Sequence, residues 1–88
     1  MKRNPDFLLN TVAGKQVLVP VGKAAVKFPG MVSVNNTGAY IWELLENEIT
    51  MDAVIAEITT RYDVSAEIAQ KDAALFIERL RSVKAIID

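Results

Sequence analysis

The chain of 88 residues contains no cysteine and no histidine. Without cysteine it forms no disulfide, no cysteine metal site and no thiolate nucleophile, a composition that fits a reducing compartment. Without histidine it lacks the base of the usual catalytic triads and a ligand of most zinc sites. We therefore expect a protein that is not an enzyme and that has no cofactor.

Long apolar runs and glycine-rich loops are also missing. No apolar stretch approaches the ~18 residues that a membrane-spanning helix needs, and the start does not resemble a signal peptide because its apolar run breaks at Asn10. The four glycines are scattered and build no phosphate-binding loop. We expect a single cytoplasmic domain over residues 1–88, without a membrane partner.

Charge is unevenly distributed along the chain, although the formal net charge is only −1. Up to Val34 there are five basic residues and one acidic residue, a net charge of +4, whereas the rest has five basic and ten acidic residues, a net charge of −5. Such an asymmetry either arises by chance in a short chain or suits the first half to an acidic partner.

The first half of the chain predicts a three-stranded antiparallel β-meander. Turn signals at Ala13-Gly14 and at Pro29-Gly30 separate its apolar runs. The predicted strands are residues 7–12, 15–21 and 31–35. The sequence assigns no path to residues 22–30.

The apolar residues of the first two strands do not alternate cleanly with polar ones. Leu8 and Leu9 are neighbours, and so are Val17, Leu18 and Val19. If helices cover one face of the sheet, apolar groups remain on the other face, and a large exposed apolar patch is uncommon on a monomer. We therefore expect Leu8, Val17 or Val19 to lie in a surface for self-association or for docking of an enzyme partner.

The second half predicts three helices followed by a short extended piece. The first covers residues 37–46 with Asn36 or Thr37 as its N-cap, the second begins after Thr50, and the third begins after Ser65 and runs to residue 83. On the last two helices, apolar residues recur at helical spacing, which predicts one buried face on each. These residues are Met51, Val54, Ile55, Ile58 and Tyr62, and then Ile68, Ala69, Ala73, Phe76, Ile77, Leu80 and Val83.

Three strands and three helices indicate an α+β domain with a winged-helix-like arrangement. This arrangement raises a DNA-binding transcriptional regulator as an alternative function. A helix that reads DNA is basic on its exposed face, whereas the third predicted helix combines Lys71, Arg79 and Arg81 with an equal number of acidic residues. We therefore expect no nucleic-acid partner.

An ordered set of motifs extends over some fifty residues from Met31 to Leu80. It consists of Val34-Asn35, Thr37-Gly38-Ala39, Ile41-Trp42, Tyr62-Asp63, Asp72 and Leu80. This set resembles the PqqD-like family. The resemblance implies a winged-helix-like module that binds the leader segment of a ribosomally made precursor peptide. It also implies a maturation enzyme as partner, often a radical S-adenosylmethionine protein; in the founding pathway the product is pyrroloquinoline quinone.

The residues themselves also favour peptide binding. A third strand at the sheet edge offers unpaired backbone groups to an extended peptide, and residues 31–35 contain no proline. The resemblance implies that the leader pairs with this strand and packs on the third helix, where Leu75 lies off the core stripe. The predicted peptide-binding residues are Met31, Val32, Ser33 and Val34 on the strand and Lys71, Asp72, Leu75 and Arg79 on the helix.

Overall fold

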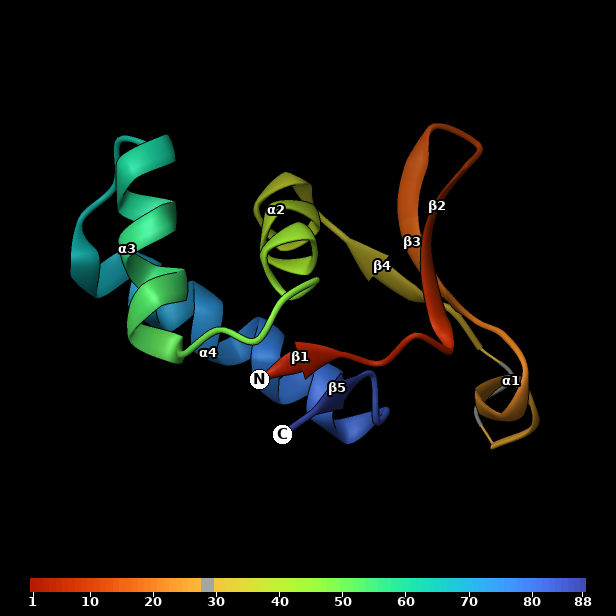
Figure 1. Ribbon diagram of the computed structural model, residues 1–88. Helices are drawn as coiled ribbons and strands as arrows, with labels where there is room; N and C mark the ends of the chain where they lie inside the picture. Colours follow the sequence, from red (N-terminus) through yellow and green to blue (C-terminus); the bar gives the residue numbers. More distant parts are fainter. Residues whose placement is uncertain (28–29) are drawn as a thin grey trace.

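The computed structural model describes residues 1–27 and 30–88 and has an α+β architecture (Figure 1). The main sheet is antiparallel, with the order β2-β3-β4. A second, two-stranded antiparallel sheet pairs β1 with β5. The strands are β1 (Lys2–Arg3), β2 (Phe7–Val12), β3 (Lys15–Pro20), β4 (Val32–Val34) and β5 (Ile86–Ile87), and the helices are α1 (Lys23–Lys27), α2 (Asn36–Leu44), α3 (Met51–Arg61) and α4 (Ala66–Ser82).

The predicted meander and the three predicted helices are confirmed, as is the final extended piece, which forms β5. Two elements were not predicted. Strand β1 pairs with the opposite end of the chain, and α1 occupies part of the segment whose path the sequence did not assign. The predicted turn at Pro29-Gly30 includes Pro29, which lies outside the described residues.

The hairpin between β2 and β3 has a two-residue turn. Val12 pairs with Lys15, and the two residues between them have positive φ, 53° for Ala13 and 79° for Gly14. Positive φ at both positions is the geometry that matches the twist of the flanking strands. The freedom of Gly14 was predicted, whereas the left-handed conformation of Ala13 was not.

The pairing register divides the sheet into an inner face and an outer face, because residues opposite one another on neighbouring strands share a face. Leu18 pairs with both Leu9 and Val32, and these residues face the core. The outer face carries the pair Leu8 and Val19, and the central Val17, which pairs with Ser33. Leu8 is 54% exposed and stays available for the expected docking surface, whereas Val17 is buried. It lies on the middle strand, where both neighbouring strands cover it.

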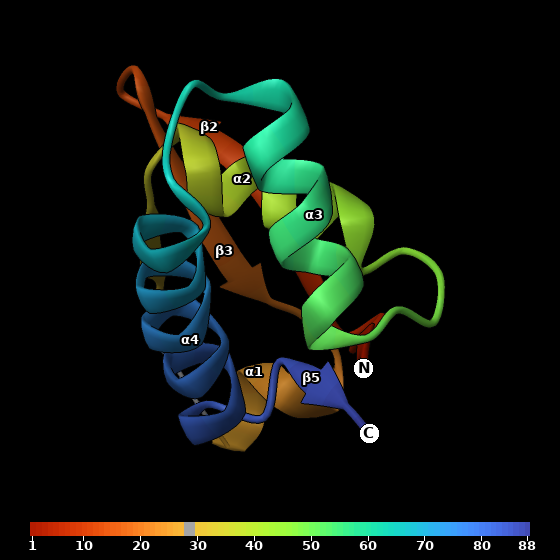
Figure 2. The ribbon, with the colours of Figure 1, turned by 90° about the vertical axis from the view of Figure 1, so that its left-hand side faces the viewer.

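Helix α2 lies beside the inner face of the sheet, and α3 packs against α2 and α4 on the side away from the sheet (Figure 1). Figure 2 shows α3 and α4 in front, with α2 between them and the sheet behind. Trp42, Ile58 and Leu80 are buried as predicted, whereas Ile55 and Phe76 are only partly buried. The other large, fully buried side chains are Leu18, Ile41, Leu45 and Val54.

One residue of the predicted core face of α4 is misplaced. Ile68 is 52% exposed, whereas Ala69, Ala73, Ile77 and Leu80 are buried. The core stripe of α4 is narrower than the sequence pattern, because small alanines at two of its positions let α4 approach its neighbours closely. Ile68 therefore lies outside the contact.

Each of the three long helices begins with a polar cap. Thr50 Oγ1 accepts a hydrogen bond from the Ala53 amide, and Ser65 Oγ accepts one from the Ile68 amide, both at 3.2 Å. These two caps were predicted. The cap of α2 is Asn35, one residue before the expected Asn36 or Thr37, because β4 ends at Val34 and the chain enters the helix at once.

The turn from β4 into α2 depends on Gly38. The side-chain oxygen of Asn35 accepts a hydrogen bond of 2.8 Å from the Gly38 amide. A Cβ atom at Gly38 would lie 2.9 Å from Val34 Cγ1, 3.0 Å from Phe76 Cε1 and 3.2 Å from Asn35 Oδ1. Since these distances are shorter than almost all real contacts of a Cβ atom, glycine is what allows β4, α2 and α4 to meet here.

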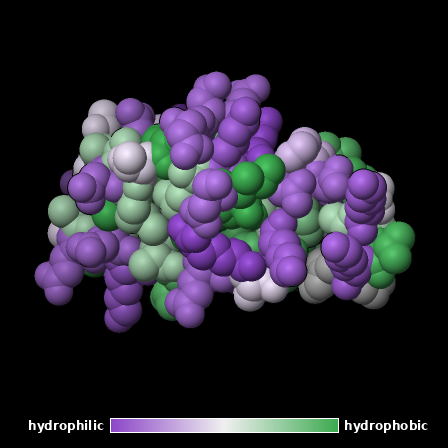
Figure 3. Space-filling view, turned by 60° about the horizontal axis from the view of Figure 1, so that its bottom comes forward, coloured by the Kyte–Doolittle hydropathy of each residue, from purple (hydrophilic) through white to green (hydrophobic). Residues whose placement is uncertain are grey.

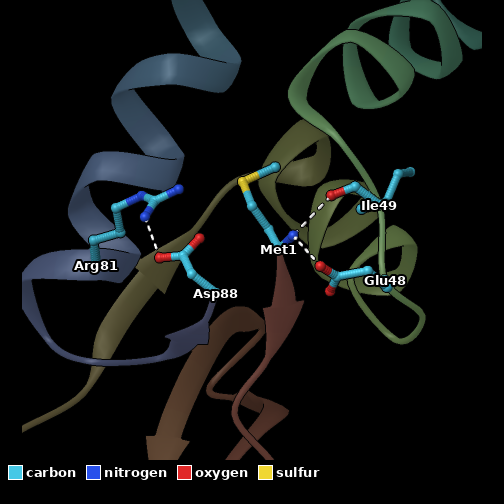
Figure 4. A network of polar contacts seen from close by, with 5 residues as sticks. All are labelled: Met1, Glu48, Ile49, Arg81 and Asp88. Carbon is cyan, nitrogen blue, oxygen red and sulfur yellow. Dashed lines mark hydrogen bonds and ion pairs between the residues drawn. The ribbon is translucent and has the colours of Figure 1, made fainter.

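The first and the last residues of the described chain lie close together (Figure 1). The Met1 nitrogen donates to Glu48 Oε1 at 3.0 Å and to the Ile49 carbonyl at 2.9 Å, and Arg81 forms an ion pair with Asp88 (Figure 4). The β1–β5 pair joins these two regions. Contacts between residues so far apart in the sequence carry no local signal, which explains why β1 was not predicted.

The replacement Gly38→Ala tests whether the junction is as tight as the distances indicate. The added methyl group overlaps Val34 and Phe76, so we expect a loss of about 1–3 kcal/mol in the free energy of unfolding. Urea denaturation measures it. The control is Ala39→Gly at the next residue, which removes a methyl group instead of adding one. It should cost only about 1 kcal/mol. If Gly38→Ala is no less stable than the wild type, the close approach is wrong.

Candidate functional site

Strand β4 is an edge of the main sheet. It pairs with β3 on one side, and no strand among the described residues pairs with its other side. It is only three residues long and contains no proline. The unpaired N–H and C=O groups of such an edge are a template for an added strand.

A groove of about 270 Å³ lies between the end of β4, the first turns of α2 and one face of α4. It is lined by Ser33, Asn35, Thr37, Gly38, Ile41, Asp72, Leu75, Phe76 and Arg79. Its floor is apolar, because Ile41 and Phe76 belong to the core or pack against it. Its rim is polar and charged.

The α4 side of the groove is one helical stripe. Asp72, Leu75, Phe76 and Arg79 recur at i, i+3, i+4 and i+7, the spacing that brings side chains onto one face. Leu75 is 61% exposed and lies between the two charges. Asp72 and Arg79 are separated by about 10 Å along the helix axis. The groove therefore offers an apolar contact with a charge of opposite sign at each end.

Four of the eight predicted site residues come together in this groove, namely Ser33, Asp72, Leu75 and Arg79. The side chains of Val32 and Val34 are buried in the core. These two residues therefore offer mainly their backbone groups to a ligand at the edge.

The remaining two predicted site residues, Met31 and Lys71, are exposed but do not line the groove. Met31 is 57% exposed and precedes β4, and Lys71 is exposed one helical turn before Leu75 without lining the groove. The prediction missed the α2 side of the groove. The signal for it was present in the sequence, because a glycine in the first turn of a helix indicates close approach of another element.

The charged groups of the groove have no protein partner. Among residues 1–27 and 30–88, neither the Asp72 carboxylate nor the Arg79 guanidinium forms an ion pair or a side-chain hydrogen bond. By contrast, Arg3 pairs with Glu46 at 3.9 Å and donates to the Trp42 carbonyl at 3.2 Å. The Asp72 and Arg79 side chains therefore remain available beside the open strand edge.

A larger hollow of about 680 Å³ lies beside β2, the other edge of the sheet, and is lined in part by Leu8, Leu9 and Trp42. The Arg3 side chain of this hollow is already engaged, because its guanidinium lies 5.7 Å from the Trp42 ring centroid.

The face of the molecule seen in Figure 3 carries mostly hydrophilic side chains, and these separate the apolar patches of that face. The groove beside β4 is therefore the better candidate for a binding site.

A cluster on the α2–α3 side contains the one titratable group with a clear shift among the described residues. Tyr40 Oη donates to Glu57 Oε2 at 3.3 Å, and the Arg61 guanidinium lies 4.5 Å from the Tyr40 ring centroid. Burial, together with the hydrogen bond to Glu57, raises the pKa of Tyr40. Its partners all belong to the helices that it joins, so the cluster holds α2 against α3.

The groove combines an apolar floor with two charged side chains. The part of the chain that the structure describes contains no group of three or more acidic, histidine or cysteine side chains able to hold a metal ion. The groove contains one carboxylate and one guanidinium about 10 Å apart along the helix axis.

Comparison with known proteins identifies the family. The family described as coenzyme PQQ synthesis protein D (PqqD) matches residues 15–86, which include the main sheet from β3 onward and all three long helices. The chain belongs to the PqqD family. No curated protein sequence matches this PqqD-family chain.

Two solved structures share the PqqD-type, winged-helix-like fold of the chain. One is described as TbiB1 in complex with the TbiA(beta) leader peptide, with a TM-score of 0.74, 19% sequence identity and full coverage of both chains. The other is described as lasso peptide synthetase B1 complexed with the leader peptide, with a TM-score of 0.69 and 21% identity, covering 92% of this chain and 89% of that one. At such low identity the likeness concerns the fold.

The described residues of this PqqD-family chain form four helices. None of them combines the length and the apolar character that a membrane crossing requires.

Two neighbouring residues of α4 should differ sharply in their effect on stability. Leu75→Asp removes an exposed side chain, so we expect a loss of at most about 1 kcal/mol, mainly from helix propensity. Phe76→Ala removes a ring that packs against the core and should cost more than about 1.5 kcal/mol. Urea denaturation of both variants measures the difference. Equal losses would mean that Leu75 belongs to the core and not to a binding surface.

Proposed function

We propose that this PqqD-family chain binds the leader segment of a ribosomally made precursor peptide and presents it to a maturation enzyme. The observation that carries the proposal is the open edge of β4 beside the groove on α4. The proposal is supported by the two solved structures of the same fold, each of which is described as a complex with a leader peptide.

The leader adds as a strand to β4. Its backbone groups pair with those of Val32–Val34, and its alternate side chains turn toward the groove. Ordering about three residues costs about 3–6 kcal/mol, whereas each new hydrogen bond contributes only about 1 kcal/mol net. Backbone pairing alone therefore does not hold the peptide, and burial of an apolar side chain in the groove has to supply the rest.

Leu75 and Phe76 provide that apolar contact. Burial of about 100 Å² of apolar surface contributes about 2.5 kcal/mol. This contribution adds to that of the backbone hydrogen bonds, which by themselves at best offset the cost of ordering the peptide. Leu75 is exposed in the isolated chain and becomes covered when the leader is present. The chain itself performs no reaction in this scheme; its task is to hold the precursor so that the enzyme acts on the part beyond the leader.

The enzyme contacts a different surface from the leader. We propose a radical S-adenosylmethionine enzyme or another maturation enzyme of the cytoplasm, where ribosomally made peptides appear. The outer face of the sheet remains free when the leader occupies the β4 edge, and its Leu8 and Val12 are exposed. The same face serves a homodimer if the chain self-associates, which sedimentation with and without Leu8→Ser measures.

Titration of the chain with leader peptides taken from short open reading frames that neighbour its gene tests the proposed function. Backbone amide shifts should concentrate at residues 32–35 and along the groove face of α4. Leu75→Asp should weaken binding by more than about 1 kcal/mol, because it places a charge in a desolvated contact. Isothermal calorimetry measures the affinity, and circular dichroism verifies the fold.

Ala74→Asp is the matched control, because it adds the same charge to the same helix at an exposed position outside the groove. It should bind the leader as the wild type does. If leader-induced shifts lie on the exposed face of α3, or if DNA and not peptide shifts the amides of α4, the proposed function is wrong and a DNA-binding role takes its place.

A further inference from the structure

The main sheet has two edges, and the edge beside the groove is the shorter one. Strand β2 forms the other edge and is six residues long, whereas β4 has three residues. The hollow beside β2 is also larger than the groove beside β4, about 680 Å³ against about 270 Å³. By length and by space alone, β2 would be the better place for an extended peptide to add.

The pairing of β2 with β3 decides which of its backbone groups point outward from the sheet. In an antiparallel pair, every second residue directs its N–H and C=O groups to the neighbouring strand, and the residues between them direct theirs away from it. The Phe7 amide donates to the Asn4 carbonyl at 3.1 Å and therefore not to β3. The alternation then makes Phe7, Leu9 and Thr11 the outward residues of β2.

Two of these three outward amides already have an acceptor within the chain. The Phe7 amide is held by the Asn4 carbonyl, and the Thr11 amide donates to the side-chain oxygen of Asn10 at 2.9 Å. Among residues 1–27 and 30–88, the Leu9 amide alone of the three has no acceptor. A strand that paired with β2 would place its own carbonyl groups opposite two amides already in use, and a carbonyl buried without a donor is costly.

The edge of β4 lacks this protection. Val17 of β3 directs its backbone groups to Asn10 of β2, so its pair with Ser33 on the other side is not hydrogen-bonded. The backbone groups of Ser33 therefore point outward. In the part of the chain that the structure describes, no hydrogen bond occupies the Ser33 amide. The shorter edge is thus the open one.

We propose that Asn10 is a specificity residue, which closes the β2 edge to strand addition and so directs the leader to β4. Its side chain is exposed, and its hydrogen bond to the adjacent amide is local, so the closure is present in the isolated chain. The statement about the leader rests on the proposed function and deepens it. The closure itself can be tested without a leader.

Self-association tests the closure, because a second copy of the chain is a strand partner that is always present in solution. Two β2 strands related by a twofold axis would pair through their outward residues. Asn10→Ala frees the Thr11 amide in both copies, so we expect the dissociation constant of the dimer to fall about tenfold or more. Sedimentation of the variant and the wild type at concentrations up to about 1 mM measures it.

Hydrogen exchange and two further variants assign the effect to the freed amide. Protection should appear at the Leu9 and Thr11 amides of associated Asn10→Ala. Thr11→Ala keeps both the Asn10 acceptor and the backbone donor, so it should associate as the wild type does. The double variant Asn10→Ala/Thr11→Pro lacks the freed donor and should return to the wild-type level, because proline is tolerated on an edge strand where the N–H group faces solvent. Circular dichroism verifies the fold of each variant.

Three results would overturn the closure by Asn10. The first is an Asn10→Ala chain that associates no more tightly than the wild type. The second is a Thr11→Ala chain, or a folded double variant, that associates as tightly as Asn10→Ala. The third is association of Asn10→Ala without protection of the Leu9 and Thr11 amides, and this measurement decides the question even if the double variant does not fold.

Titration with a leader peptide separates this inference from the proposed function. If the leader shifts the amides of residues 7–12 of the wild type as strongly as those of residues 31–35, Asn10 does not direct it to β4, although leader binding stands. If the leader shifts neither edge, the proposed function fails, and sedimentation still decides whether Asn10 closes β2.

Discussion

The absence of a side chain at Gly38 is the constraint on which the rest of the site depends. Because a Cβ atom there would lie within 3.0 Å of both Val34 and Phe76, the backbone of α2 approaches β4 and α4 as closely as atoms allow. The Asn35 cap fixes the direction in which the helix leaves the strand. The distance between the strand edge and the α4 stripe, and so the width of the groove, follows from these contacts.

Most of the fold could be predicted from the sequence because its signals are local. The Ala13-Gly14 turn, the caps at Thr50 and Ser65 and the apolar periodicity of α3 each depend on a few neighbouring residues. The β1–β5 pair and the burial of Val17 depend on segments that meet only in the folded chain. Ile68 fits the helical pattern of a core residue but is exposed, since the pattern does not tell how wide the buried stripe is.

The candidate site was predictable only where its signals are local in the sequence. Leu75 and its charged neighbours could be recognised as a surface stripe, because helical periodicity separates them from the core face. The strand residues could not be sorted into backbone and side-chain contributors without the register with β3, which turns Val32 and Val34 inward and Ser33 outward. The groove joins the end of β4 and the start of α2 to a distant part of α4, and no spacing in the sequence relates these segments.

The brevity of β4 has a consequence for the behaviour of the chain at high concentration. A long, flat open edge invites any other strand, including one from a second copy, and leads to aggregation. An edge of three residues under a helix supports too few hydrogen bonds to nucleate a growing sheet. The edge strand is thus long enough for a peptide that also fits the groove, and too short to seed a fibril.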